Sequence, residues 1–289
     1  MWMVAESVHA VTYFAPTCRQ SLRDVGLKGF WAGYFAARAS PLGAVGAGPV
    51  TAAFFNFDPA MVRRAVPSCW DAVDPDTLTV RRAEAAGGAL QQLCTPDALR
   101  TLVAALPTLR RAVARCAGEG RPMTGANREL WPSVEAALRR RGSPEPIIEV
   151  GEVWQACTTL REHRGDGHVA ALLTEGLSGL EAHLLAAGTL GVPADLLRDN
   201  RGWSEPQWDE AVTRLAGRGL LGADGVATAA AVELHRRLEA MTDDLAAPAF
   251  ADLADDDVAN LHGALWGCAA QVQASGLIPF PNPIGLPAL

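Results

Sequence analysis

The residues best suited to chemistry gather between positions 161 and 168, where the chain reads REHRGDGH and holds two of the six histidines. Its two glycines allow a sharp turn of the backbone. A helix dipole disfavours an imidazolium in the first turn, so we expect a neutral His168 that can accept a proton. We predict His163 or His168 as general acid or base, with Asp166 orienting it. The alternative is a solvated corner between two helices, with Asp166 as the cap.

An aromatic stripe provides a second set of candidates. Trp31, Tyr34 and Arg38 recur at three- and four-residue spacing, which places them on one helix face. Such a stripe is typical of a core, but the guanidinium of Arg38 then needs a carboxylate or an anionic ligand. We expect a ligand pocket between the two halves of the chain, lined by these three residues together with Trp154 and Arg164.

The sequence assigns no cofactor. His163 and His168 lie five residues apart, which is not the spacing that puts two metal ligands on one helix face. A haem or metal site would need distant ligands and stays an alternative. Neither a phosphate-binding loop nor a GxSxG nucleophile motif is present. The six cysteines are widely spaced and are expected to be buried thiols.

Composition and charge limit the classes of partner. With 289 residues, 49% hydrophobic and 20% charged, the sequence is typical of a globular protein. The net charge is −7, divided into +4 over residues 1–150 and −11 over residues 151–289. An acidic surface repels nucleic acid and anionic membranes, so neither is an expected partner. The first residues do not resemble an export signal, which predicts a cytoplasmic protein.

Helical periodicity runs through almost the whole chain, so the predicted fold class is mainly α. A boundary near Gly142-Ser143-Pro144 predicts a helical N-terminal domain (1–145) and a second domain (146–289) that ends in an extended Pro-rich tail. Residues 118–127 are predicted to be a loop. A long helix is expected from about residue 147 to 163, stopping at Gly165.

The second domain shows a recognisable order of elements. Helices are expected at 178–190, 193–198, 204–217 and 228–245. Ala223-Asp224-Gly225 between two short apolar pairs indicates a short β-hairpin before the last helix. This is the order of a winged helix-turn-helix domain.

Residues 208–248, which begin WDEAVTRLAGRGLLGADGVAT, resemble the winged-helix core of MarR-type regulators. The resemblance implies that the helix before RGLL is the recognition helix and that ADG is the wing. The wider chain is similar to an actinobacterial SalK-like family, through GYFAARASPLG (33–43), GRPMTGAN (120–127), REHRGDGHVAAL (161–172), RGWSEPQW (201–208) and PFPNPIG (279–285).

The implied recognition helix is a poor DNA reader, because it carries Glu205, Asp209 and Glu210, and the implied wing has Asp224 and no cation. We therefore expect a homodimeric, small-molecule-binding protein. An enzyme of specialised, natural-product metabolism with non-redox, histidine-based acid/base chemistry is favoured. The alternatives are a ligand-responsive MarR-type regulator and a haem- or metal-binding protein.

Overall fold

The computed structural model describes residues 1–222 and 225–289 and confirms the mainly α class. The first half of the chain forms short and medium helices. These are α1 (Trp2–His9), α2 (Val11–Phe14), α3 (Pro16–Arg23), α4 (Phe30–Ala39), η1 (Ser40–Leu42), α5 (Ala47–Ala53), α6 (Pro59–Arg63), η2 (Ser68–Asp71), α7 (Pro75–Leu93), α8 (Pro96–Ala104) and α9 (Leu106–Arg115).

The second half contains the longer helices. They are α10 (Pro122–Arg141), α11 (Glu145–Thr174), α12 (Gly179–Leu190), α13 (Ala194–Arg201), α14 (Glu205–Gly217), α15 (Ala229–Ala246), η3 (Ala247–Phe250) and α16 (Asp255–Ala274). Local sequence explains several of their starts: the side chains of Ser178 and Ser204 each form a capping box with the residue three positions on.

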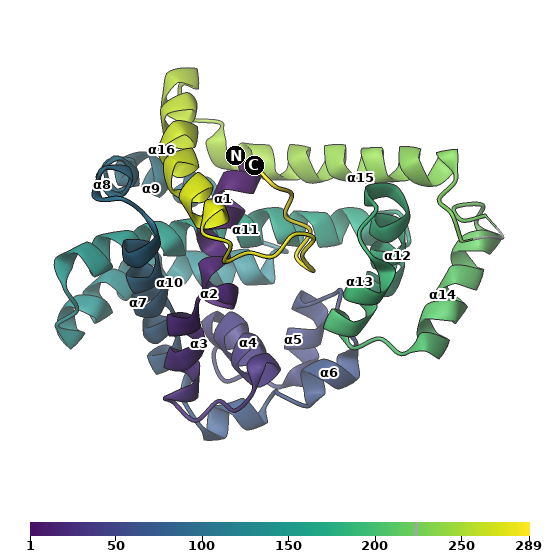
Figure 1. The fold of residues 1–289 in the computed structure, drawn as a ribbon, viewed down its shortest axis with the longest axis horizontal. Helices are drawn as coiled ribbons and strands as arrows, with labels where there is room; N and C mark the ends of the chain where they lie inside the picture. The colour runs from purple at the N-terminus through teal and green to yellow at the C-terminus, as the bar shows by residue number, and fades with distance from the viewer. Residues whose placement is uncertain (223–224) are drawn as a thin grey trace.

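Helix α11 is the centre of the molecule. Figure 1 shows α15 running along it, with α1, α7 and α10 packed around its first half. The crossing of α7 and α11 is close because both helices present glycine: a Cβ on Gly87 would lie 2.7 Å from the carbonyl oxygen of Ile147. α11 is therefore buried on several sides, as expected of a central scaffold helix.

Two hydrophobic clusters meet along α11. The first combines side chains between residues 4 and 160 with others between 249 and 286, so α16 and the C-terminal tail pack against the N-terminal helices. The second lies between residues 171 and 238. In the tail, Ile278 and Leu286 are buried, and Asn282 exchanges hydrogen bonds with the backbone of Leu286.

Two local predictions are wrong. α11 does not stop at Gly165 but continues to Thr174, and α10 already begins at Pro122, inside the predicted loop at 118–127. Glycine in a helix costs only about 1 kcal/mol relative to alanine, and the packing of α11 exceeds that cost. Gly167 also lets α15 approach, because a Cβ there would lie 3.1 Å from Cβ of Leu245.

The predicted hairpin is represented by one antiparallel bridge, between Leu221 and Ala227, with Gly222 N–H donating to the Val226 carbonyl at 2.8 Å. Residues 223 and 224, at its predicted tip, lie outside the described residues. A winged hairpin is therefore not confirmed. All six cysteines are free and buried. No single helix of the described chain is long and apolar enough to cross a membrane, although α11 and α12, bent by 96°, pass that test together.

Candidate ligand-binding site

A cavity of about 670 Å³ lies between the two hydrophobic clusters. Its walls come from α1, α4, α5, α11, α12, α13 and α15, and the C-terminal tail covers part of it through residues 280–287. Figure 1 shows this tail returning toward the middle of the molecule from α16. Five predicted site residues line the cavity, namely Tyr34, Arg38, Arg164, Asp166 and His168. Helices from both halves of the chain are needed to bring them together.

One part of the wall is a buried ion pair between Arg38 and Glu162. Nε and Nη2 of Arg38 donate to the two carboxylate oxygens of Glu162 at 3.1 and 3.0 Å. Arg38 Nη1 also lies 3.2 Å from the Tyr34 hydroxyl. Glu162 is thus the carboxylate partner that we expected Arg38 to need at the end of an apolar stripe. The pair joins α4 to α11 across 124 residues of sequence.

Asp166 and His168 both face the cavity, but each is already hydrogen-bonded. Oδ2 of Asp166 accepts from the backbone N–H and the hydroxyl of Thr124, both at 2.8 Å. Because α11 is continuous, Asp166 is not a helix cap, and His168 is not in a first turn. Nδ1 of His168 lies 3.0 Å from the Thr242 hydroxyl on α15. Burial lowers the pKa of His168, so the neutral imidazole predicted from the sequence arises from desolvation instead of a helix dipole.

His163 lies on a different side of α11 and is not among the residues that line the cavity. Its ring is 2% exposed, and its Nδ1 lies 3.3 Å from Nη1 of Arg121, which also donates to the His163 carbonyl at 2.7 Å. Burial and the Arg121 charge lower the pKa of His163 to about 4. The structure thus separates the two histidines that we expected to share one site.

The remaining predicted residues divide between the cavity and the core. Arg164 donates to Glu239 at 2.7 Å and Asp243 at 3.1 Å on α15, which ties α11 to that helix. Trp31 packs among the aromatic rings of the first cluster. Trp154 is fully buried, and its indole N–H donates to the His9 carbonyl at 3.1 Å. Neither tryptophan lines the cavity, because both side chains pack in the first hydrophobic cluster.

Sequence reasoning missed Arg201, which lines the cavity from the end of α13. It is 8% exposed, makes no ion pair with a described residue, and donates only to the carbonyls of Asn200 and Pro283. Its guanidinium lies 4.6 Å from the centre of the Phe57 ring, and its Nε has no hydrogen-bond partner. Burial lowers the pKa of Arg201 to about 10, so it stays charged at neutral pH. Nothing in its local sequence distinguishes it from a surface arginine.

The cavity also contains an acceptor without a donor. Both carboxylate oxygens of Glu6 are buried without a hydrogen bond, although Nε of Arg161 lies 3.3 Å from one of them. Burial raises the pKa of Glu6. No group of three or more His, Cys, Asp or Glu residues in the described chain is arranged to hold a metal ion. The cavity wall therefore carries both a guanidinium, that of Arg201, and the carboxylate of Glu6.

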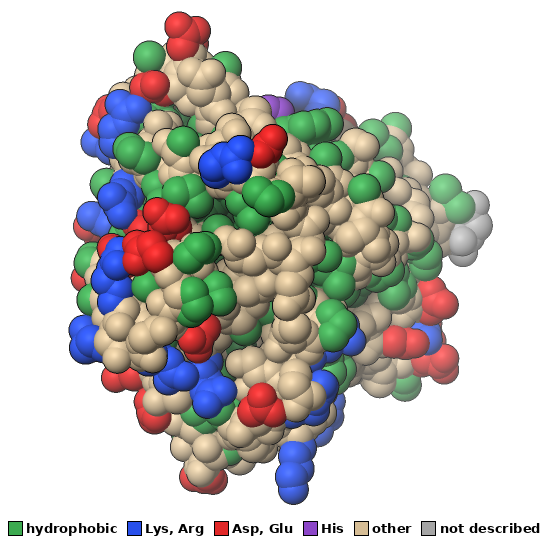
Figure 2. Space-filling model, turned by 60° about the vertical axis from the view of Figure 1, so that its left-hand side comes forward, with side chains coloured by type: hydrophobic (Ala, Val, Ile, Leu, Met, Phe, Trp, Pro, Cys, Tyr) green, Lys and Arg blue, Asp and Glu red, His purple; other side chains and the backbone are tan. Residues whose placement is uncertain are grey.

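Helices α13 and α14 form a helix-turn-helix unit with a short turn at residues 202–204. The exposed N-terminal part of α14 carries Glu205, Asp209 and Glu210. Figure 2 shows acidic side chains gathered on the side where Figure 1 places α14. Its arginine, Arg214, pairs with the carboxylates of Glu181 and Glu210, and Arg218, which follows the end of the helix, donates to the carbonyls of Glu175 and Gly176.

Comparison with known proteins gives one result. No curated protein and no solved structure matches the chain. The sequence model of a helix-turn-helix family matches residues 1–279, nearly the whole chain, and this agrees with the α13–α14 unit. The chain is therefore a member of this helix-turn-helix family.

Proposed function

We propose that this protein binds a small organic molecule in the 670 Å³ cavity, with a polar or anionic group of the ligand against Arg201. The observation that carries the proposal is a buried guanidinium without a carboxylate partner in a cavity of ligand size. Phe54, Phe57 and Leu172 offer apolar surface to the rest of the molecule. Resemblance to SalK-like and MarR-type proteins supports a ligand from specialised metabolism and a cytoplasmic homodimer.

Binding is better supported than catalysis. A general base must reach its substrate, and a partner must be free to orient it. Asp166 is held by Thr124, 42 residues away in sequence, and His163 lies outside the cavity. Of the three residues, His168 lines the cavity and has a ring nitrogen, Nε2, that makes no hydrogen bond with a described residue. A catalytic role for His168 stays a prediction.

The experiment uses 8-anilinonaphthalene-1-sulfonate, an anionic aromatic probe whose fluorescence rises in apolar surroundings. Gly165→Leu introduces a side chain into the cavity, since a Cβ on Gly165 has only Glu162 Oε2 within 4 Å, at 3.8 Å. The matched control is Gly263→Leu, at an exposed helical glycine with no atom near its Cβ. Both changes favour the helix.

We expect saturable binding to the native protein and to Gly263→Leu, and its loss in Gly165→Leu. Arg201→Gln should weaken binding about tenfold or more, because a hydrogen bond to a charged group contributes about 1.5–3 kcal/mol. Mass spectrometry of molecules released on denaturing the purified protein would identify a natural ligand. Equal probe binding by Gly165→Leu and the native protein would contradict the proposal.

A ligand-responsive regulator is the second candidate, favoured by the family match. The exposed carboxylates of α14, and the engagement of Arg214 and of Arg218 just after the helix, argue against tight DNA binding. A gel-shift series over increasing salt concentration distinguishes the two candidates. A DNA-binding regulator would shift the DNA at low salt and lose its affinity steeply as the salt concentration rises. We expect no shift.

A further inference from the structure

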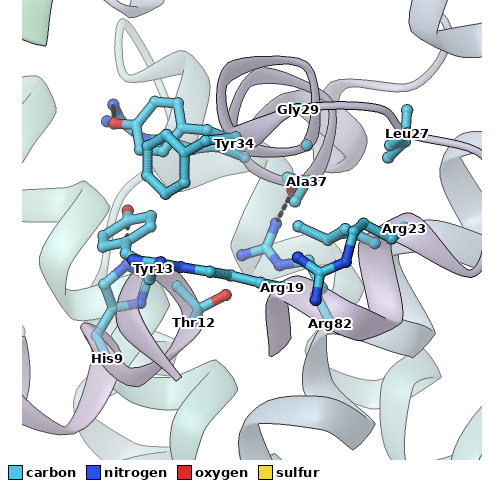
Figure 3. A pocket seen from close by; sticks show the side chains of 14 residues that line it. His9, Thr12, Tyr13, Arg19, Arg23, Leu27, Gly29, Tyr34, Ala37 and Arg82 are labelled. Atoms are coloured by element: carbon cyan, nitrogen blue, oxygen red, sulfur yellow. Dashed lines mark hydrogen bonds between the residues drawn. The ribbon is translucent and has the colours of Figure 1, made fainter. Parts of the chain in front are cut away.

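A second, smaller cavity of about 180 Å³ lies between α1, α2, α3, α4 and α7. Tyr34 and Arg38 line both cavities and so form the wall between them. Figure 3 shows the rings of Tyr13 and Tyr34 at one end of the smaller cavity, the side chains of Leu27 and Arg23 toward the other, and the guanidinium of Arg82 between them, bonded to Ala37. The space belongs to the N-terminal helices and lies outside the site described above.

The charges around this cavity are one-sided. Its lining contains four arginines, Arg19, Arg23, Arg38 and Arg82, and neither Asp nor Glu. Of these four, Arg38 alone forms an ion pair with a carboxylate of the described residues, that of Glu162. By contrast, the larger cavity is lined by four arginines and four acidic residues. The smaller cavity is therefore the more electropositive of the two, which favours an anion.

Arg82 is the critical residue. It is 6% exposed, and its Nη1 donates to the Ala37 carbonyl at 2.7 Å. Its guanidinium lies 5.0 Å from the centre of the Trp154 ring. Arg82 makes no ion pair with any residue that the structure describes. Burial lowers its pKa to about 10, so the side chain still carries its charge at neutral pH. A buried, charged guanidinium with free N–H groups is a strong donor for an oxyanion.

A chain of hydrogen bonds runs beside the same Trp154 ring, on which His9 stacks with 5.8 Å between the ring centres. Nε2 of His9 lies 2.9 Å from the Tyr13 hydroxyl, and Nδ1 of His9 lies 2.9 Å from the Thr158 hydroxyl. Burial lowers the pKa of His9 well below its ordinary value, so the ring is neutral and adds no charge. Leu22, Leu27 and Phe30 contribute apolar surface. The cavity thus combines guanidinium groups with apolar surface.

We propose that the smaller cavity binds a small organic carboxylate, with its carboxylate against Arg82 and its hydrocarbon part against Leu22, Leu27 and Phe30. The planar fork of arginine matches a carboxylate in shape. The volume, well below the range of about 300–1,000 Å³ typical of larger ligands, limits the hydrocarbon part to a single ring or a short chain. This proposal does not depend on a ligand in the larger cavity.

Isothermal titration calorimetry with benzoate tests the proposal. Benzamide, which has the same shape without the charge, is the matched ligand, and inorganic phosphate is the anion without an apolar part. The variants are Arg82→Gln, at the buried donor, and Arg19→Gln, on the exposed rim, where the side chain donates to the Tyr13 carbonyl. Arg63→Gln, at an exposed arginine outside both cavities, is the control.

We expect one benzoate per chain, benzamide binding at least tenfold more weakly, and Arg82→Gln losing at least tenfold in affinity. Arg19→Gln should lose severalfold, and Arg63→Gln should match the native protein. Arg19→Gln decides the matter if Arg82→Gln fails to fold. Benzoate binding should persist in Gly165→Leu, which separates this site from the larger cavity. Absence of benzoate binding, binding of phosphate in preference to benzoate, or unchanged affinity in the arginine variants would overturn the proposal.

Discussion

Replacing Glu162 with Gln removes the negative charge that compensates two buried arginines. Glu162 is 2% exposed; the side chains of Arg38 and Arg161 are 12% and 17% exposed. Arg161 lies 2.8 Å from the same carboxylate oxygen that accepts from Nε of Arg38. The glutamine side chain keeps the size of the group but leaves both guanidinium charges without this partner. Arg161 keeps the carboxylate of Glu6 at 3.3 Å, whereas Arg38 is left without a carboxylate partner among the described residues.

Breaking a buried ion pair on one side costs about 3–5 kcal/mol. Domains unfold with a free energy of about 5–15 kcal/mol, so this loss is a large part of the total. Burial alone would raise the pKa of Glu162, but the charges of Arg161 and Arg38 outweigh burial and hold it well below its usual range. The stability from the pair is therefore present above the unfolded pKa of about 4.3 and is lost as the pH falls below it.

Urea unfolding followed by circular dichroism measures the effect. We expect Glu162→Gln to lower the free energy of unfolding by about 3–5 kcal/mol at pH 7, and to flatten its decrease below about pH 4.3. Glu233→Gln is the control, because Glu233 and Arg236 form an exposed pair, 50% and 69% exposed, and such a pair contributes less than about 1 kcal/mol. A loss of under about 1 kcal/mol in Glu162→Gln would refute the importance assigned to the buried pair.

Three further outcomes are expected. Burial lowers the pKa of His183 to about 3 and that of His163 to about 4, so these neutral rings stabilise the fold fully above pH 6.5, and stability falls as the pH drops below it. Urea unfolding should give a free energy of unfolding that is lower at pH 5 than at pH 7 by about 2 kcal/mol for each of these two histidines, and His183→Asn should reduce this difference. A free energy of unfolding that does not change between pH 7 and pH 5 would contradict this assignment. Gly165→Ala should raise the midpoint of thermal unfolding, because alanine favours the helix by about 0.5–1 kcal/mol and the new Cβ has space. Gly167→Ala should lower that midpoint or leave it unchanged, because its Cβ would meet Cβ of Leu245 at 3.1 Å. The opposite order of the two midpoints would show that α11 packs differently. Ser178→Ala should cost about 1 kcal/mol, measured by urea unfolding, because its hydroxyl caps α12, and an unchanged free energy would show that the cap contributes nothing.

Local signals in the sequence predicted the class of fold and several helix starts. Ser178 and Ser204 are recognisable caps because their partners lie three residues away, within the range that a short segment of chain explores by itself. A local signal of the same kind gave the wrong helix end at Gly165. A glycine between charged residues is typical of a helix end, but packing from α1, α10 and α15 holds α11 straight through it.

The candidate sites were only partly predictable. The spacing of Tyr34 and Arg38 identified a helix face, and both residues do line the two cavities. The spacing of residues could not show which arginine forms an ion pair with a carboxylate. Arg38 reaches Glu162 across 124 residues, whereas Arg82 and Arg201 reach backbone carbonyls and no carboxylate. Such differences depend on long-range contacts that no local pattern encodes.

The sequence by itself determined a mainly helical chain, its helix caps and the acidic character of α14, because these depend on neighbours a few residues apart. Only the tertiary structure decided that His163 and His168 point to different surroundings and that Trp154 belongs to the core. It also decided that two arginines, Arg82 and Arg201, are buried without an ion pair to any acidic residue in the described part of the chain. The physical reason is that burial and charge compensation are properties of the packed chain, in which residues far apart in sequence exclude water from one another.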